Sequence, residues 1–263
     1  MLQEISLFGL TVSMYNVFNI LSMLILFLYF ILKTKRFVNI CPHALKQKTA
    51  KKQYMVAFAE TAAIFIVGMI LLYFLNTGFG KWFTEGNANY YGSLTAWLSA
   101  FIIVPLLFGI SPLNAADMFT MGLPLSLFVA KIACFFHGCC HSFELSGSFY
   151  FNQNTHRSEF PVQLVEAFVA LAIYFCLRAF KKKIPQGDLF PAYIILFSVT
   201  RFFTEFLRDD TPDVLGPFNA YQILSVIYAF IGLFLFISIK AEQDRRASNR
   251  GNRSGKGKRT KKG

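Results

Sequence analysis

The sequence predicts an all-α, polytopic membrane protein with about seven transmembrane helices, its N-terminus outside the cytoplasm and its C-terminus cytoplasmic. Three observations support this fold class. Of the 263 residues, 55% are hydrophobic and only 15% are charged, whereas a soluble domain carries about 25% charged residues. Seven stretches are apolar over about 20 residues, the length that crosses the hydrocarbon layer. Most Lys and Arg residues fall after alternate stretches.

The seven apolar stretches are the predicted helices, taken in chain order. They cover 13–32, 54–75, 90–110, 117–137, 161–180, 189–207 and 219–239. The first lacks a basic segment before it and a small-residue cleavage site after it, so we expect a retained helix and not a signal peptide. The chain has 32 Phe and 11 Tyr, as is common in lipid-facing helices and interfacial belts.

The distribution of basic residues predicts the orientation of these helices. Loop 33–53, the segment 178–183 after the fifth helix and the tail from Lys240 together hold 21 of the 26 Lys and Arg residues. The alternate loops hold Lys81, Arg157 and Arg208. Because Lys and Arg are retained on the cytoplasmic side, the three basic segments are expected inside and the N-terminus outside.

The C-terminal tail differs in composition from the rest of the chain. Residues 241–263 are rich in Lys, Arg, Gly, Ser and Asn, and such a segment cannot bury enough apolar surface to fold. We therefore expect a transmembrane domain at 1–240 and a basic, disordered cytoplasmic tail at 241–263. The tail's charge is expected to set topology and to lean on the anionic headgroups of the lipid bilayer, with no nucleic acid as partner.

Several ionisable residues lie inside the predicted spans, where a charge is expensive and usually faces protein or water. They are Glu60, Lys131, Glu166, Arg201 and Glu205. All but Glu60 fall in the outer half of their helices under this topology, and Arg201, Glu205 and Arg208 share one helix face. One interpretation is an intrahelical salt bridge; the other is a polar cavity that holds an anionic headgroup. Glu60 is expected to snorkel or to pair with a lysine of the basic loop.

The segment His137-Gly138-Cys139-Cys140-His141 follows the fourth helix. Its spacing does not favour zinc, since adjacent cysteines seldom bind one tetrahedral ion and ligand pairs are usually two to four residues apart. A vicinal disulfide or a redox role is a second reading. The preferred interpretation is a tight turn at Gly138 with small side chains packed beside it. We therefore predict neither a metal nor a cofactor.

Five motifs resemble those of the prolipoprotein diacylglyceryl transferases of bacteria. Phe160–Glu166 is similar to the family's His-Pro-x-Gln-Leu-Tyr-Glu, and Arg201–Arg208 closely matches its helix-six motif. Lys131–Cys140 aligns with the signature Arg-x-Gly-Asn/Cys-Phe-x-Asn-Gly, and Tyr91–Leu94 falls where the family has His-Gly-Gly-Leu. The opening Ile5–Leu10 with Tyr15 resembles the family's periplasmic start.

The resemblance implies a multi-pass enzyme of the bacterial inner membrane. Such an enzyme transfers diacylglyceryl from phosphatidylglycerol to the thiol of a lipobox cysteine in a prolipoprotein signal peptide. Arg201 would hold the phosphate, and Lys131 would add a second positive charge. Glu205 would orient Arg201, and Glu166 would bind the glycerol hydroxyls or relay a proton.

The acceptor thiol needs a base or a positive field, and His137 is our candidate base. Substrate contacts are expected from the remaining motif residues: Tyr15, Tyr91, Gly92, Gly138, Cys139, Gln163 and Arg208.

Several family positions are altered in this sequence. Tyr91 replaces a histidine, Ser93 a glycine and Lys131 the signature arginine, while Cys139 and Ser142 stand at positions that are typically acidic and glycine. Two alternatives therefore stay open: a paralogue that uses the same phospholipid with a different acceptor, and a non-catalytic lipid-binding membrane protein.

Overall fold

The computed structural model describes residues 4–7, 10–77, 99–100, 102–183, 187–209 and 213–259. Its long helices are α1 (Met14–Phe37), α3 (Ala50–Thr77), α6 (Pro112–Thr120), α7 (Gly122–His137), α8 (Val162–Phe180), α9 (Leu189–Thr204) and α10 (Ala220–Arg259). Short turns of helix are η1 (Val38–Ile40), α2 (Pro42–Leu45) and η2 (Glu205–Leu207).

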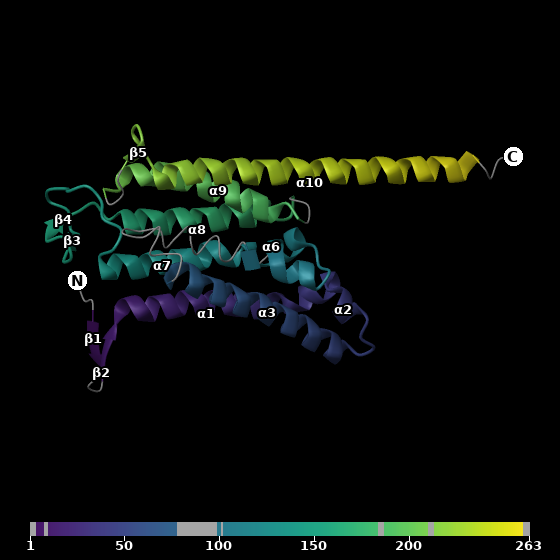
Figure 1. Cartoon of the computed structure of the whole chain (residues 1–263), viewed down its shortest axis with the longest axis horizontal. Coiled ribbons are helices and arrows are strands. Elements are labelled where there is room, and N and C mark those ends of the chain that lie inside the picture. The colour runs from purple at the N-terminus through teal and green to yellow at the C-terminus, as the bar shows by residue number, and fades with distance from the viewer. Residues whose placement is uncertain are drawn as a thin grey trace.

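Three small antiparallel strand pairs, which the helical prediction did not include, decorate the helices. They are β1 (Glu4–Leu7) with β2 (Leu10–Ser13), β3 (Phe151–Asn152) with β4 (Arg157–Ser158), and β5 (Asp213–Leu215) with β6 (Phe218–Asn219). All three lie at the end of the bundle that carries the N-terminus (Figure 1). Their strands are two to four residues long, and each pair forms a sheet of only two strands.

The long helices pack side by side along the chain (Figure 1). Helix α1 lies between α3 and α7, and α7 packs on α8, α8 on α9 and α9 on α10. Because consecutive helices run back and forth, the end of α7, the start of α8 and the end of α9 come to the same level. That level is the end of the bundle with the strand pairs.

Four helices of the described chain are long and apolar enough to cross a membrane: Val17–Ile40, Val162–Phe180, Leu189–Leu207 and Ala220–Arg245. The consecutive helices α6 and α7 make a fifth if they form one bent span. The side chains exposed along α1 and α10 are mostly large and apolar, as a lipid-facing surface requires. The predicted second span falls within α3, and the predicted third is described only at 99–100 and 102–110.

The predicted continuous span 117–137 is in fact interrupted. Helices α6 and α7 meet at an angle of 49°. Pro124 in the first turn of α7 lacks the N–H that would donate to the carbonyl of Thr120, so an unbroken helix would lose a hydrogen bond here. Gly122 lets the bend approach α1, because a Cβ at Gly122 would lie 3.0 Å from the ring of Tyr29.

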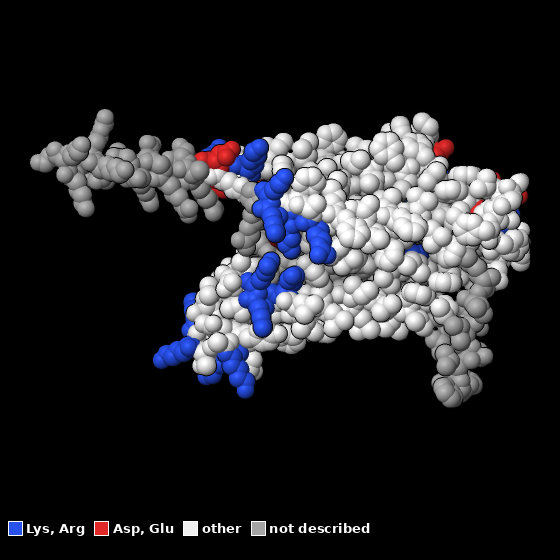
Figure 2. Space-filling view, turned by 180° about the vertical axis from the view of Figure 1, so that it is seen from behind, with Lys and Arg blue, Asp and Glu red and all other residues white. Residues whose placement is uncertain are grey.

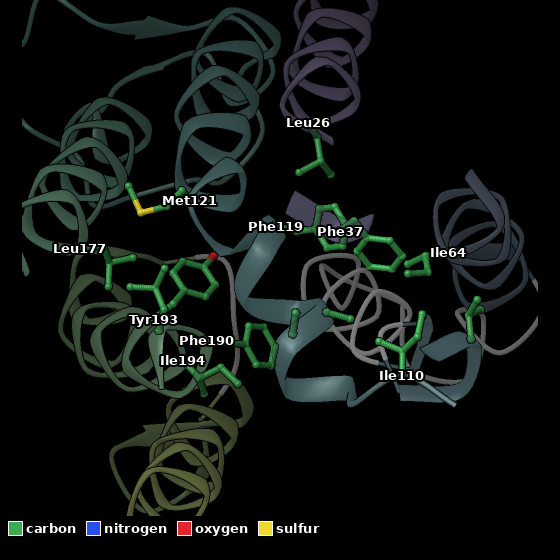
Figure 3. Close-up of a cluster of buried hydrophobic side chains, with 14 of the residues drawn as sticks. Leu26, Phe37, Ile64, Ile110, Phe119, Met121, Leu177, Phe190, Tyr193 and Ile194 are labelled. Carbon is green, nitrogen blue, oxygen red and sulfur yellow. The ribbon is translucent and has the colours of Figure 1, made fainter. Parts of the chain in front are cut away.

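A cluster of buried apolar side chains gathers around α6 (Figure 3). Phe119 of α6 packs on Phe37 of α1, with ring centroids 6.3 Å apart. Asp117 fixes α6 to the start of α9, since its carboxylate accepts hydrogen bonds from the backbone N–H groups of Gly187 and Phe190 at 2.5 and 2.7 Å. Polar side chains lie away from this core, at the end of α7, α8 and α9 that carries the strand pairs.

Basic side chains gather at the end of the molecule opposite the strand pairs, and the surface between the ends is largely uncharged (Figure 2). Helix α10 extends past the neighbouring helices on that basic side (Figure 1). It continues through most of the predicted tail to Arg259, where composition predicted disorder. A single helix beyond its packing partners has only its own hydrogen bonds to hold it. The domain boundary at 240/241 stays a prediction.

Candidate functional site

The four charged residues predicted at one depth come from three neighbouring helices. Lys131 lies about two turns before the end of α7, and Glu166 about one turn after the start of α8. Arg201 belongs to the last turn of α9, and Glu205 opens η2 directly after it. Since these ends meet at one level of the bundle, the side chains converge. Tertiary packing thus brings together residues that are up to 74 positions apart in the sequence.

Glu166 lies at the centre of this group and contacts three cations. Lys131 Nζ lies 2.6 Å from Glu166 Oε2, and Arg201 donates to Glu166 Oε1 through Nη1. The Nη1 atom of Arg208 lies 3.7 Å from the same Oε1. The second carboxylate, Glu205, receives the other fork of Arg201, with Oε2 at 2.7 Å from Nη2. We call Lys131, Glu166, Arg201, Glu205 and Arg208 the ion cluster.

The ion cluster is buried. Lys131, Glu166, Arg201 and Glu205 are only 7%, 6%, 6% and 2% exposed. Charges taken out of water must be matched by close partners of opposite sign, or the desolvation penalty dominates. In the cluster each carboxylate meets at least two basic side chains. The predicted salt bridge between Arg201 and Glu205 is present, and it is part of a network across three helices.

Sequence reasoning missed two partners at the start of α10: Asn219, the last residue of β6, and Tyr221 in the first turn of α10. Asn219 Nδ2 donates to Glu205 Oε1 at 3.2 Å, and the ring of Tyr221 lies 5.8 Å from the guanidinium carbon of Arg201. Asn219 also forms a reciprocal cap with Gln222, each side-chain oxygen accepting from the other residue's backbone N–H at 3.0 Å. A polar cap residue followed three positions later by Gln is a recognisable start of a helix, so the segment Asn219–Gln222 carried a usable signal.

A small cavity of about 20 Å³ adjoins the ion cluster. Its polar end is formed by Lys131, Glu166 and Arg201, with the hydroxyl residues Thr200 and Thr204 beside them. The remaining walls are apolar and come from the same three helices: Leu127, Val169, Ala170, Ile173 and Phe197. The cavity therefore has cationic groups at one end and an apolar surface along the rest. An anionic lipid has the matching arrangement, with a charged headgroup attached to apolar chains.

The turn after α7 is built around Gly138. This residue has φ +76°, and a Cβ there would lie 2.7 Å from Asn152 Oδ1, so only glycine fits. Gln163 fixes the next two residues, because its Nε2 donates to the carbonyls of Cys139 and Cys140 at 2.7 and 2.9 Å. The structure places Gly138 and Cys139 in one turn that Gln163 of α8 holds; their predicted contacts with substrate remain a prediction.

The following loop is organised by Glu159, a fully buried residue that sequence reasoning also missed. Its carboxylate accepts hydrogen bonds from Asn152 Nδ2 at 2.9 Å and from Thr155 Oγ1 at 2.5 Å. Asn152 Nδ2 also donates to the Gly138 carbonyl at 3.1 Å. A buried carboxylate is stable only with such donors, so Glu159 fixes the loop that covers the end of α7.

Two further predicted residues form a pair. The ring of Tyr15 lies against that of His137, with centroids 4.5 Å apart. His137 is exposed at the end of α7; its assignment as a base stays a prediction. Tyr91 and Gly92 lie outside the described residues.

One of the two predictions for Glu60 was a pair with a lysine of the basic loop. The contacts that the structure describes for Glu60 include no lysine. It accepts from Cys41 Sγ at 2.5 Å and lies 3.2 Å from His43 Nδ1. Glu60 is therefore held by Cys41 and His43 at the start of α2. These residues are distant in sequence from the ion cluster.

Comparison with known proteins gives the chain a family. The sequence model described as "Prolipoprotein diacylglyceryl transferase" matches residues 3–238. A protein of Clostridium perfringens named phosphatidylglycerol--prolipoprotein diacylglyceryl transferase 2 is 28% identical over 131 residues, which are 47% of this chain and 51% of that protein. The match thus spans about half the length of this relative.

Relatives with the same name, without the numeral, occur in other bacteria. That of Ehrlichia ruminantium (strain Welgevonden) is 27% identical over 195 residues, 64% of this chain and 71% of the relative. That of Lactobacillus acidophilus is 27% identical over 169 residues, 58% and 60% of the two chains. The family match covers nearly the whole chain and includes the ion cluster. This chain belongs to the prolipoprotein diacylglyceryl transferase family.

Proposed function

We propose that the protein transfers a diacylglyceryl group from phosphatidylglycerol to the thiol of a lipobox cysteine in a prolipoprotein. The observation that carries this proposal is the buried ion cluster at the polar end of an apolar cavity. The family and the names of the relatives point to the same substrates. A site that couples cationic donors to an apolar wall suits a phospholipid whose phosphate must leave.

The cavity suggests how the phospholipid lies. The acyl chains would follow Leu127, Ile173 and Phe197, and the phosphodiester would sit by Lys131 and Arg201. Glu205 holds one fork of Arg201 and so presets the guanidinium plane, which favours bidentate binding of phosphate oxygens. Arg208 lies beside both carboxylates of the cluster and supplies a third positive charge.

The reaction joins the acceptor sulfur to the carbon of the diacylglyceryl group that carried the phosphate. The C–S bond forms as the C–O bond breaks, and the leaving glycerol phosphate keeps the bonding electron pair. The negative charge that develops on its oxygen is stabilised by donors that are already in place, in a site shielded from water. Arg201 and Lys131 would supply this stabilisation, Glu166 would keep both oriented, and His137 would accept the thiol proton.

Seven spans with an outer N-terminus and a cytoplasmic C-terminus remain our proposal for the topology. The concentration of basic side chains at one end supports it (Figure 2), because that end is expected inside. The ion cluster then lies in the outer half of the membrane, where signal peptides emerge. Residues 1–240 would form the catalytic domain in the inner membrane, and 241–263 a basic cytoplasmic segment.

Complementation tests the proposal. Cells depleted of their own transferase would receive this protein, and lipoprotein modification would be followed by gel shift. We expect rescue by the unaltered chain and loss of rescue with Arg201→Ala or Glu205→Ala. Arg178→Ala is the matched control, since Arg178 is exposed on α8 and contacts Tyr174. Arg201→Lys keeps the charge without the fork, so it separates folding from bidentate binding.

The altered motif positions favour one second candidate, the same lipid with a different acceptor. Lys131 and Cys139 depart from the usual signature, and both lie at or beside the site. Mass spectrometry of products from labelled phosphatidylglycerol distinguishes the candidates. Modified lipobox cysteines support the first, and another lipidated thiol or hydroxyl supports the second. If the protein consumed no phosphatidylglycerol at all, the remaining alternative would be a lipid-binding protein that is not an enzyme.

A further inference from the structure

Three cysteine sulfurs meet beside the ion cluster. Cys134 lies one turn before the end of α7, and Cys139 and Cys140 follow the turn at Gly138. The chain folds back there, and the three Sγ atoms all lie within 4.8 Å of one another. All three cysteines are free and partly exposed. Spacing within His137–His141 had argued against a metal, but that argument omitted Cys134, which arrives from the helix.

The separations of the sulfurs suit a metal ion better than a disulfide. A Zn–S bond of about 2.3 Å places tetrahedral thiolates roughly 3.8 Å apart, and the three Sγ atoms already lie within 4.8 Å of one another. A disulfide needs a sulfur separation of about 2.05 Å and leaves the third thiol without a role. A set of three soft sulfur ligands selects thiophilic ions such as zinc.

The backbone around these sulfurs is held in place before any ligand binds. Gln163 holds the carbonyls of Cys139 and Cys140, and Cys140 adopts φ +65°, a conformation rare for residues with a side chain. The residues that follow are anchored by an isolated antiparallel β-bridge, a backbone pairing, between Ser142 and Arg208. A site with fixed ligands loses little entropy when an ion enters.

Two cations lie near the sulfurs. The charges of Lys131 and Arg208 both act on Cys140. A divalent ion with three thiolates carries one net negative charge. The two cations therefore stabilise the loaded site.

We propose that Cys134, Cys139 and Cys140 bind one Zn²⁺ ion and leave its fourth coordination position open. Three protein ligands with an open position are typical of catalytic zinc. Resting on the proposed transferase function, the open position would take the acceptor thiol. Bound there, the ion would lower the pKa of that thiol, and His137 would take its proton.

Metal binding by the purified full chain tests the site directly. The protein would be reduced, stripped of metal, and titrated with Zn²⁺ and with Co²⁺, whose absorption reports thiolate ligands. We expect one ion per chain. Cys134→Ser, Cys139→Ser and Cys140→Ser should each weaken binding on the order of 100-fold, because every thiolate supplies a large share of the binding free energy. Cys176→Ser is the matched control on α8 and should bind as the unaltered chain does.

Several results would overturn the inference. They are no bound ion in the reduced protein, undiminished binding after all three replacements, or a disulfide among the three cysteines with no metal uptake. Thermal unfolding of each metal-free variant checks that the fold survives. The transfer assay on the same samples separates the two proposals. Metal binding without transfer refutes only the proposed transferase function. Full transfer by metal-free protein refutes the proposed role of zinc in the transfer.

Discussion

Replacing Glu166 with glutamine tests whether the ion cluster is held together by its central carboxylate. The side chain keeps its shape and loses its charge. Lys131 Nζ at 2.6 Å, Arg208 Nη1 at 3.7 Å and the Arg201 guanidinium then face a neutral amide. All of these groups are almost inaccessible to water, so solvent cannot replace the missing charge.

The expected loss of stability follows from that burial. Removing one partner of a buried ion pair costs about 3–5 kcal/mol, and Glu166 serves three cations. Such a loss is a large part of the roughly 5–15 kcal/mol by which a folded protein is stable. Glu144→Gln is the matched control, because Glu144 is exposed on the loop after α7. We expect it to change stability by less than about 0.5 kcal/mol.

The measurement is reversible unfolding in mixed detergent micelles, followed by circular dichroism. A double-mutant cycle with Lys131→Met isolates the pair, since methionine keeps the volume of the lysine stem. The double variant should lose less than the sum of the single losses, by about 1–3 kcal/mol. A loss under about 1 kcal/mol for Glu166→Gln, or strict additivity in the cycle, would show that the cluster's contacts do not govern its stability.

Three further predictions concern the turn and the cap around the site, each measured by the same unfolding assay. Gly138→Ala should destabilise by at least about 2 kcal/mol, through positive φ and crowding by Asn152. Gly147→Ala, also at positive φ but in open space, should cost only about 1–2 kcal/mol, and equal losses would contradict the crowding. Asn219→Ala should cost about 1 kcal/mol by loss of the cap and should lower transfer, because Glu205 loses a donor; unchanged transfer would argue against that link. Gln163→Leu leaves the carbonyls of Cys139 and Cys140 without their donor and should cost about 1–3 kcal/mol each, whereas a neutral effect would mean that water replaces the amide.

The sequence alone determined the membrane character and identified the charged residues of the ion cluster. Apolar stretches of helical length are a local property, because each span satisfies its own backbone hydrogen bonds. A charge inside such a stretch is detectable without knowing its partner, since lipid makes it expensive. Lys131, Glu166 and Arg201 were identified on that ground, and the structure brings all three together.

Only the tertiary structure decided which groups meet. The central position of Glu166 depends on α7, α8 and α9 ending at one level, and the contribution of Asn219 depends on α10 packing against α9. The sulfur cluster depends on Gly138, which turns the chain so that Cys139 and Cys140 return to Cys134. Contacts between helices arise from side-chain packing over long separations in sequence, and no local pattern encodes them. Local chemistry therefore named the charged residues, and packing between helices made them a site.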